Sequence, residues 1–268
     1  MTRFRIDLGY RGTDFHGWAK QPGLRTVQDS LEAGLSRITG AEVATIVAGR
    51  TDAGVHARRQ VVHIDLAEEG IEKLIGKSSR PAEAALLSRL RGVLTVDDTD
   101  DIVIHAVSEV PEDFDARFSA LWRTYQYRLA DRRSFIDPLL TPVTPRHKGE
   151  LDAEAMAEAA REAQGLHDFI PFCKPREGAT TIRTLHELEV TRDQEAVITI
   201  DLRADAFCHH MVRALVGGLI KVGSGTWPVT RPAELLAEAD TGVDPDVPMF
   251  VSPAHGLVLT GVGYPEAE

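Results

Sequence analysis

Several features are scarce in this sequence of 268 residues, and each shortage narrows the possible functions. The two cysteines, Cys173 and Cys208, lie in different segments and form no metal-type pair, so the simplest interpretation is a reduced, cytoplasmic setting. No apolar run is long enough to cross a membrane, and no apolar signal segment follows Met1–Arg5. We therefore expect a cytoplasmic protein with no membrane partner.

Basic residues are also scarce. Thirty Lys and Arg stand against 41 Asp and Glu, which gives a net charge of -11 and argues against a nucleic-acid partner, because phosphate contacts need cations. The distribution of charged residues along the chain weakens this argument against a nucleic-acid partner. The acidic residues gather at 97–101, 109–115 and 234–246, whereas the arginines gather at Arg50, Arg58, Arg59, Arg117, Arg123, Arg128, Arg132 and Arg133. A local basic surface is adequate for RNA, although charge alone favours a mixed, solvated surface.

The hydrophobic content of 43% and the charged content of 26% are typical of a globular protein with one large or two small domains. Apolar periodicity predicts strands at 3–10, 43–48, 60–66 and 102–107 and helices at 27–38 and 82–90 in the first half. Thr26 is the expected N-cap of the helix at 27–38, and Gly40 is its expected stop.

The second half has a similar pattern. It predicts strands at 122–129, 185–191, 196–203 and 256–262, helices at 153–163 and 207–222, and an extra helix at 233–239. Each half thus has the core order β-α-β-β-α-β, which is typical of a ferredoxin-like unit. The sequence predicts an α/β fold with two such lobes, at 1–110 and 111–268.

The segment AGRTDAGVHA, at 48–57, follows the predicted strand at 43–48 and presents one carboxylate, Asp52, on a loop bracketed by Gly49 and Gly54. Glycine permits backbone angles that other residues avoid. Arg50 lies two residues before Asp52, and a neighbouring guanidinium favours the ionised carboxylate. This arrangement suits a nucleophile or a general base. An ordinary turn is the alternative, and the spacing alone favours it.

Several segments match the motifs of a known family in their residues and in their order along the chain. They are GYRGTDFHGW at 9–18, TVQ at 26–28, GRTDAGVHA at 49–57, ARFSA at 116–120, YQY at 125–127, FCHHMVR at 207–213 and GLVL at 256–259. Together they closely resemble the tRNA pseudouridine synthase A (TruA) family over nearly the whole chain. The resemblance implies isomerisation of uridine to pseudouridine at positions 38, 39 and 40 in the anticodon stem-loop of tRNA. It also implies a homodimer, with an extended, mostly antiparallel sheet that has helices on one side and an active-site cleft between the lobes.

The resemblance also implies roles for residues. Asp52 matches the catalytic aspartate, which attacks the ribose or removes a ribose proton. Tyr125 matches the active-site tyrosine, whose ring gives a flipped base a stacking partner; a sheet residue is the alternative. Arg213 lies in an apolar helix and is expected to pair with Asp52 or to extend its head into water. Arg50 is expected to flip the base, bind phosphate or stabilise its loop.

Further substrate contacts are expected at Arg58, His209 and His210. Adjacent helical residues point in different directions, so the two histidines favour RNA contact or helix capping over a metal site. His56 and His63 are expected to be structural. The isomerisation transfers no electrons, and we expect no cofactor. The first alternative function is a non-catalytic RNA-binding protein on the same scaffold. The second is a hydrolase that uses Asp52, for which no second acid or base is evident.

Overall fold

The computed structural model describes residues 1–77, 79–96, 101–174, 178, 180–243 and 250–265. The acidic stretches 97–100 and 244–246 fall outside them. The chain forms two compact units, one of Met1–Leu121 with Leu259–Glu268 and one of Trp122–Val258. The sequence predicts a single division between residues 110 and 111. The last residues return to the first unit because strand β9 (Leu257–Gly263) is the sheet neighbour of β3.

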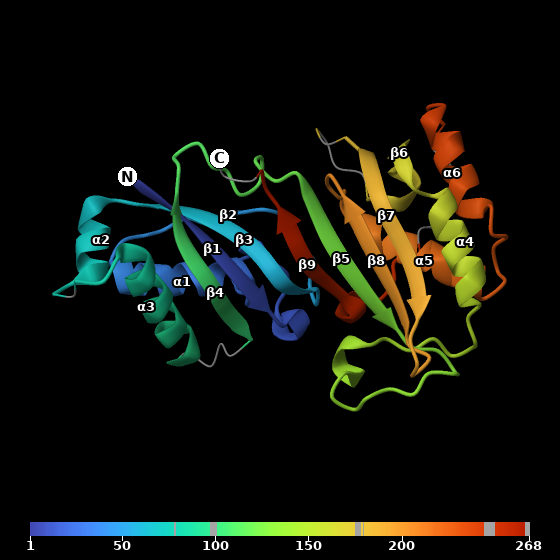
Figure 1. Cartoon of the computed structure of the whole chain (residues 1–268), viewed down its shortest axis with the longest axis horizontal. Coiled ribbons are helices and arrows are strands. Elements are labelled where there is room, and N and C mark those ends of the chain that lie inside the picture. The colour runs from blue at the N-terminus through green and yellow to red at the C-terminus, as the bar shows by residue number, and fades with distance from the viewer. Residues whose placement is uncertain (78, 97–100, 175–177, 179, 244–249, 266–268) are drawn as a thin grey trace. The chain divides into compact units, whose positions relative to one another are not determined.

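The first unit contains the predicted strands and helices and one further helix. Its elements are β1 (Thr2–Tyr10), α1 (Val27–Thr39), β2 (Ile46–Val47), β3 (His56–Leu66), α2 (Glu68–Ile75), α3 (Ala82–Val96) and β4 (Ile102–Val110), shown in Figure 1. Strand β1 pairs antiparallel with β3 and with β4, and β2 pairs antiparallel with β3. The predicted helix α1 is confirmed with both ends. The Thr26 side chain accepts from Asp29 N, and Gly40 ends the helix with φ 76°.

Two expectations for this unit need correction. The predicted strand at 43–48 shortens to Ile46–Val47, because the Thr45 amide donates to Glu32 Oε1 at 2.8 Å instead of to a neighbouring strand. Helix α2 was not predicted from the sequence. It has eight residues and buries only Gly70 and Leu74, so its apolar periodicity is too brief to detect.

The second unit likewise contains the expected elements, with one additional strand. They are β5 (Trp122–Leu129), α4 (Ala153–Glu162), β6 (Gly165–Asp168), β7 (Ile182–Arg192), β8 (Ile198–Ala204), α5 (Met211–Gly223) and α6 (Arg231–Asp240). The strands pair antiparallel in the order β5-β8-β7-β6. The added strand β6 has four residues, too few for an alternating pattern. Helix α5 begins four residues later than the sequence predicts.

Each unit buries one face of its strands against its helices. In β1, Phe4, Ile6 and Leu8 are fully buried, whereas the intervening Arg5 and Asp7 are half-buried and form an ion pair at 2.7 Å. In β8, Ile198 and Ile200 alternate in the same way with half-buried polar residues. The described strands belong to one mostly antiparallel, nine-stranded sheet, which confirms the predicted α/β fold class. No helix within the described ranges combines the length and apolar character needed to span a membrane.

The cysteines differ from the expectation of two separate, reduced thiols. Cys173 and Cys208 are joined in a disulfide with their Cα atoms 5.8 Å apart, and neither is a free thiol. They are 35 residues apart in the sequence, and spacing alone does not predict which residues the fold will bring together. The disulfide ties the segment after the 3₁₀ turn at Ile170–Phe172 to the loop that leads into α5.

Candidate active site

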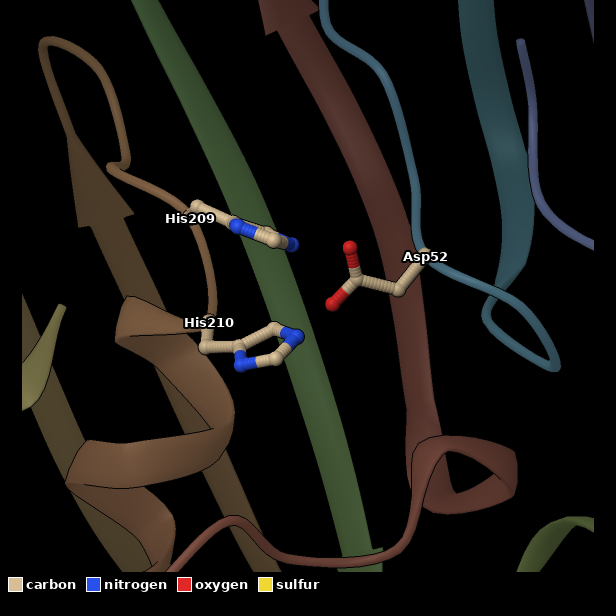
Figure 2. Close-up of side chains that lie close together, drawn as sticks. All are labelled: Asp52, His209 and His210. Atoms are coloured by element: carbon tan, nitrogen blue, oxygen red, sulfur yellow. The ribbon is translucent and has the colours of Figure 1, made fainter. Parts of the chain in front are cut away.

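Asp52 lies on the loop between β2 and β3, where it begins a tight turn (Figure 2). The Val55 amide donates to Asp52 O at 3.2 Å, and Gly54 occupies the third turn position with φ 79°. A turn of this type requires a positive φ at that position, which favours glycine. The predicted use of Gly54 is confirmed. Gly49 is not among the glycines with positive φ, so its place in the loop does not depend on that freedom.

Hydrogen bonds fix the residue next to Asp52. Thr51 Oγ1 lies 2.8 Å from the Tyr10 hydroxyl, and Thr51 O accepts from the Trp18 amide at 3.0 Å. Gln60 Nε2 donates both to the Tyr10 hydroxyl, at 3.2 Å, and to Gly49 O, at 2.8 Å. Burial raises the pKa of Tyr10 to about 12, although hydrogen bonds to Thr51 and Gln60 oppose the shift. Tyr10 is thus neutral at physiological pH and holds the loop through hydrogen bonds.

The segment that follows β1 packs directly against the backbone of the Asp52 loop. A Cβ added at Gly12 would lie 2.0 Å from Val55 O, and one added at Gly17 would lie 3.0 Å from Thr51 O. The Gly12 amide donates to His56 Nδ1 at 2.9 Å, so His56 is structural, as the sequence predicts. Backbone this close excludes side chains. The loop therefore rests on a rigid support within its own unit.

The three polar side chains near this loop differ in exposure. Asp52 is half-buried, whereas Arg50 and Arg58 are exposed. Arg50 forms no ion pair with Asp52 or with any other described residue, so the expected support of the carboxylate by Arg50 does not appear as a contact. Both arginine side chains are therefore accessible to solvent at the surface of the unit.

Tyr125 lies on β5 and faces the packed side of the sheet. Its side chain is 8% exposed, and its ring meets the Phe207 ring edge-on, with centroids 5.1 Å apart. Tyr127 shares that face and donates its hydroxyl to Pro253 O at 3.0 Å. Trp122 lies on the opposite face, as the alternation predicts. The stacking role of Tyr125 stays a prediction.

Arg213 is the third residue of α5 and the half-buried member of an otherwise buried run. Its Nε donates to Ser252 O at 2.7 Å, and the Ser252 amide donates to Arg213 O at 3.0 Å. This pair of bonds fixes both the backbone and the guanidinium of Arg213. The neighbouring residues Met211, Val212 and Ala214 belong to the core of the second unit. The expected pairing of Arg213 with Asp52 stays a prediction.

His209 and His210 require a correction, because both precede α5 and neither is helical (Figure 2). His210 has φ 68°, in the left-handed region, and its side chain makes no capping hydrogen bond. The two rings lie 4.1 Å apart between centroids instead of diverging. Lys174 N donates to His209 O at 2.9 Å and ties the loop to the segment after Cys173. The late helix start, not helical geometry, sets the direction of both rings.

Sequence reasoning located the loop but missed what holds it. Tyr10, Gln60 and Gly17 make the decisive contacts, and Tyr10 lies 41 residues from Thr51. The available signal was weak. Gln60 is a buried polar side chain in a strand of apolar residues, and such groups are usually hydrogen-bonded.

Comparison with known proteins gives consistent results across the chain. A family model described as tRNA pseudouridine synthase matches residues 159–265. A protein of Leifsonia xyli subsp. xyli named tRNA pseudouridine synthase A is 48% identical, over 98% of this chain and 92% of its own length. Proteins with the same name from Streptomyces avermitilis and Cutibacterium acnes are 47% and 44% identical, each over 100% of this chain and 90% and 91% of their own lengths.

A solved structure of the archaeal box H/ACA sRNP Nop10–Cbf5 complex also matches, over 93% of this chain and 58% of that chain. Its TM-score is 0.34 and its sequence identity 10%, which is too distant to support an argument about this site. The sequence relatives are much closer and extend along the whole chain.

Proposed function

Because this chain belongs to the tRNA pseudouridine synthase A family and is therefore an isomerase, we propose that it acts on uridines 38, 39 and 40 in the anticodon stem-loop of tRNA. Family membership disfavours the two alternatives, a non-catalytic RNA-binding protein and a hydrolase. The positions rest on the resemblance of the motifs at 9–18, 49–57, 116–120 and 207–213.

The observation that best supports this proposal is the fixed position of Asp52. Its loop is held by the Tyr10–Thr51 hydrogen bond and by backbone contacts from Gly12 and Gly17. Catalysis by a single carboxylate requires such fixed geometry, because a small misplacement of a reacting group is costly. The reaction breaks the bond from N1 to the ribose and joins C5 to the ribose. C5 loses a proton and N1 gains one, so electrons balance without a redox partner.

The other candidate residues have supporting roles in this proposal. The Tyr125 ring stacks on the flipped uracil, Arg50 flips the base or binds a phosphate beside it, and Arg58 contacts the substrate RNA. His209 and His210 contact RNA from the loop before α5. Arg213, oriented by Ser252 O, pairs with Asp52 and keeps the carboxylate ionised. Asp52 acts on the ribose as an anion, by attack or by proton removal.

The direct test uses Asp52→Asn, which keeps the size of the side chain and removes its charge. We expect tRNA binding to persist and pseudouridine formation to stop. Asp113→Asn is the matched control, because Asp113 is an exposed carboxylate of the same unit. Substrate transcripts with cytidine at positions 38, 39 or 40 locate the product, read by carbodiimide treatment and primer extension. Turnover by Asp52→Asn would exclude Asp52 from the mechanism, and product at other uridines would refute the proposed positions.

A second test concerns Arg213. Replacing it with Met removes the proposed counter-charge, so the pKa of Asp52 should rise and the remaining activity should shift to higher pH. Arg213→Lys keeps a charge without the planar fork and should be intermediate. The measurement is the single-turnover rate against pH at saturating enzyme. An unchanged profile with a near-normal rate in Arg213→Met would show that Arg213 is not the partner of Asp52.

Two further properties belong to this proposal. We expect a homodimer, in which one tRNA binds to both subunits and contacts more arginines than a single subunit offers. We also expect the protein to work in the cytoplasm, where its substrate is found. Light scattering at micromolar concentration tests the first, and a mass equal to one 29.3-kDa chain would contradict it. Fractionation of cells tests the second.

A further inference from the structure

A hollow of about 600 Å³ opens on the surface of the first unit. It forms at the end of β1, where the register of this strand shifts against both neighbours. Its walls come from β1, β3 and β4 and from the residues at their ends, namely Gly9, Tyr10, Arg11, Ala57, Arg58, Asp101, Val103 and His105. Its volume lies within the range of small-ligand sites.

The lining of the hollow is closely packed at Gly9 and presents an exposed apolar side chain at Val103. Gly9 has no side chain, and a Cβ there would lie 2.9 Å from His105 Nε2 and 3.1 Å from Ala57 O. Val103 adds an apolar surface that is 51% exposed. The space beside Gly9 is thus already filled by His105 and the β3 backbone, so the exposed Val103 side chain is the apolar surface that can accept the face of a base or a ribose.

The rim carries positive charge that the protein does not neutralise by ion pairing. Arg11 and Arg58 are exposed, and neither forms an ion pair with a described residue. Asp101 is the carboxylate of the lining, but Arg25 already engages both of its oxygens at 2.9 Å. Asp101 therefore leaves the charge of Arg11 and Arg58 largely intact. In a chain of net charge -11, two such guanidinium groups beside one hollow make a local site for an anion.

His105 adds a third polar group of defined form. Its Nε2 lies 2.9 Å from Arg58 O, and because a carbonyl oxygen only accepts, Nε2 carries the proton. Nδ1 is then the nitrogen that accepts a hydrogen bond from a ligand hydroxyl. The hollow thus combines an exposed apolar side chain, two guanidinium groups and an imidazole, which match the base, phosphate and ribose hydroxyl of a ribonucleotide.

The hollow is linked to the candidate catalytic loop within the same unit. Tyr10 lines the hollow, and its hydroxyl meets Thr51 beside Asp52 at 2.8 Å. We propose that this hollow is an RNA subsite, which holds one nucleotide of the substrate tRNA other than the uridine that is isomerised. The phosphate lies between Arg11 and Arg58, and the base or ribose lies on Val103. This inference rests on the proposed function, because it takes the ligand to be part of the same RNA.

The first experiment measures binding of a substrate tRNA transcript over a range of KCl concentrations. The variants are Arg11→Gln, Arg58→Gln and their combination. The control is Arg161→Gln, an exposed arginine of α4 in the other unit. Each single variant should weaken binding about three- to tenfold at low salt and reduce the slope of log K against log salt by about one. The double variant should lose both increments, and Arg161→Gln should bind as the wild type does.

The second experiment tests the exposed apolar surface of Val103 without removing a cation. Val103→Glu places a negative charge where the proposal puts RNA, whereas Val103→Gln is neutral and of similar size. The half-exposed position tolerates either side chain. We expect Val103→Glu to weaken binding at least tenfold more than Val103→Gln, with the difference shrinking as salt rises. Uridine monophosphate, added at millimolar concentration, tests whether the subsite binds a free nucleotide. If the subsite needs the tRNA chain, the free nucleotide will not displace the tRNA.

The outcomes separate the two proposals. If the wild type forms pseudouridine at positions 38–40 while the double arginine variant and Val103→Glu bind tRNA with the wild-type affinity and salt slope, the subsite is refuted and the proposed function stands. If the wild type modifies other uridines but these variants still lose affinity, the positions are wrong and the subsite stands. Displacement of tRNA by uridine monophosphate alone would also overturn the proposal, because the hollow would then bind free nucleotide.

Discussion

The hydrogen bond between Tyr10 and Thr51 gives the sharpest test of how the Asp52 loop is held. Gln60 Nε2 donates to the Tyr10 hydroxyl oxygen, so the proton of that hydroxyl is available to Thr51 Oγ1, 2.8 Å away. Thr51→Val keeps the shape of the side chain and removes its oxygen. The Tyr10 hydroxyl then loses its acceptor. Water does not readily replace that acceptor, because Thr51 is only 7% exposed and Tyr10 only 5%.

Leaving a buried polar group unsatisfied costs about 1–3 kcal/mol, so the free energy of unfolding should fall by that amount. Thr39→Val provides the matched control in the same unit. Thr39 is 3% exposed, and its hydroxyl donates to Leu35 O at 2.9 Å near the end of α1. The two variants should lose comparable stability. Only Thr51→Val should slow the chemical step, by roughly tenfold or more, because it loosens the loop beside the reacting carboxylate.

Urea unfolding measures the stabilities. Release of tritium from [5-³H]uridine in tRNA, in single turnovers, measures the rate, since C5 loses its hydrogen in the isomerisation. Adding Tyr10→Phe completes a double-mutant cycle, in which a coupling of about 0.5–3 kcal/mol is expected for residues in contact. A Thr51→Val protein that is destabilised like Thr39→Val but reacts at the wild-type rate would refute the view that this bond positions Asp52.

Four further predictions follow from the same structure. Tyr125→Ala should cost substrate affinity or turnover by about 1–3 kcal/mol more than Tyr125→Phe, and equal, mild effects would make Tyr125 a packing residue. Activity on a prefolded stem-loop should survive EDTA, whereas loss restored by a metal ion would contradict the expectation of no cofactor. The Cys173–Cys208 disulfide closes a loop of 35 residues and should stabilise the fold by about 3–4 kcal/mol, so reductant should lower the unfolding temperature of the wild type and not of Cys208→Ser. Burial opposes ionisation of Asp131, but hydrogen bonds from Arg192 and from backbone amides outweigh it and lower the pKa of Asp131 from 3.8 to about 2. The ionised Asp131 therefore contributes roughly 2 kcal/mol of stability above pH 3.8, and this contribution should be lost as the pH falls towards 2. Asp131→Asn should flatten that part of the acid denaturation curve.

The sequence by itself determined the elements that depend on neighbouring residues. Helix α1 lies between Thr26 and Gly40 because cap chemistry and apolar spacing are local. The alternation in β1 and β5 is equally local. The Asp52 loop was located through the resemblance of its ten residues to a known family, and Gly54 has the positive φ that its turn requires. Short elements such as β6 and α2 were missed, because too few residues carry their pattern.

Only the tertiary structure decided what supports the site. Tyr10 hydrogen-bonds to Thr51, which is 41 residues away in the sequence. Gly12 packs closely against the backbone of Val55, and a disulfide joins Cys173 to Cys208. The return of β9 to the first unit likewise depends on pairing with β3, far earlier in the chain. The physical reason is the same in each case. Periodicity, caps and turns record interactions among residues within a few positions of one another, whereas these contacts arise when packing brings distant segments together, and a single sequence carries no mark of which segments will meet.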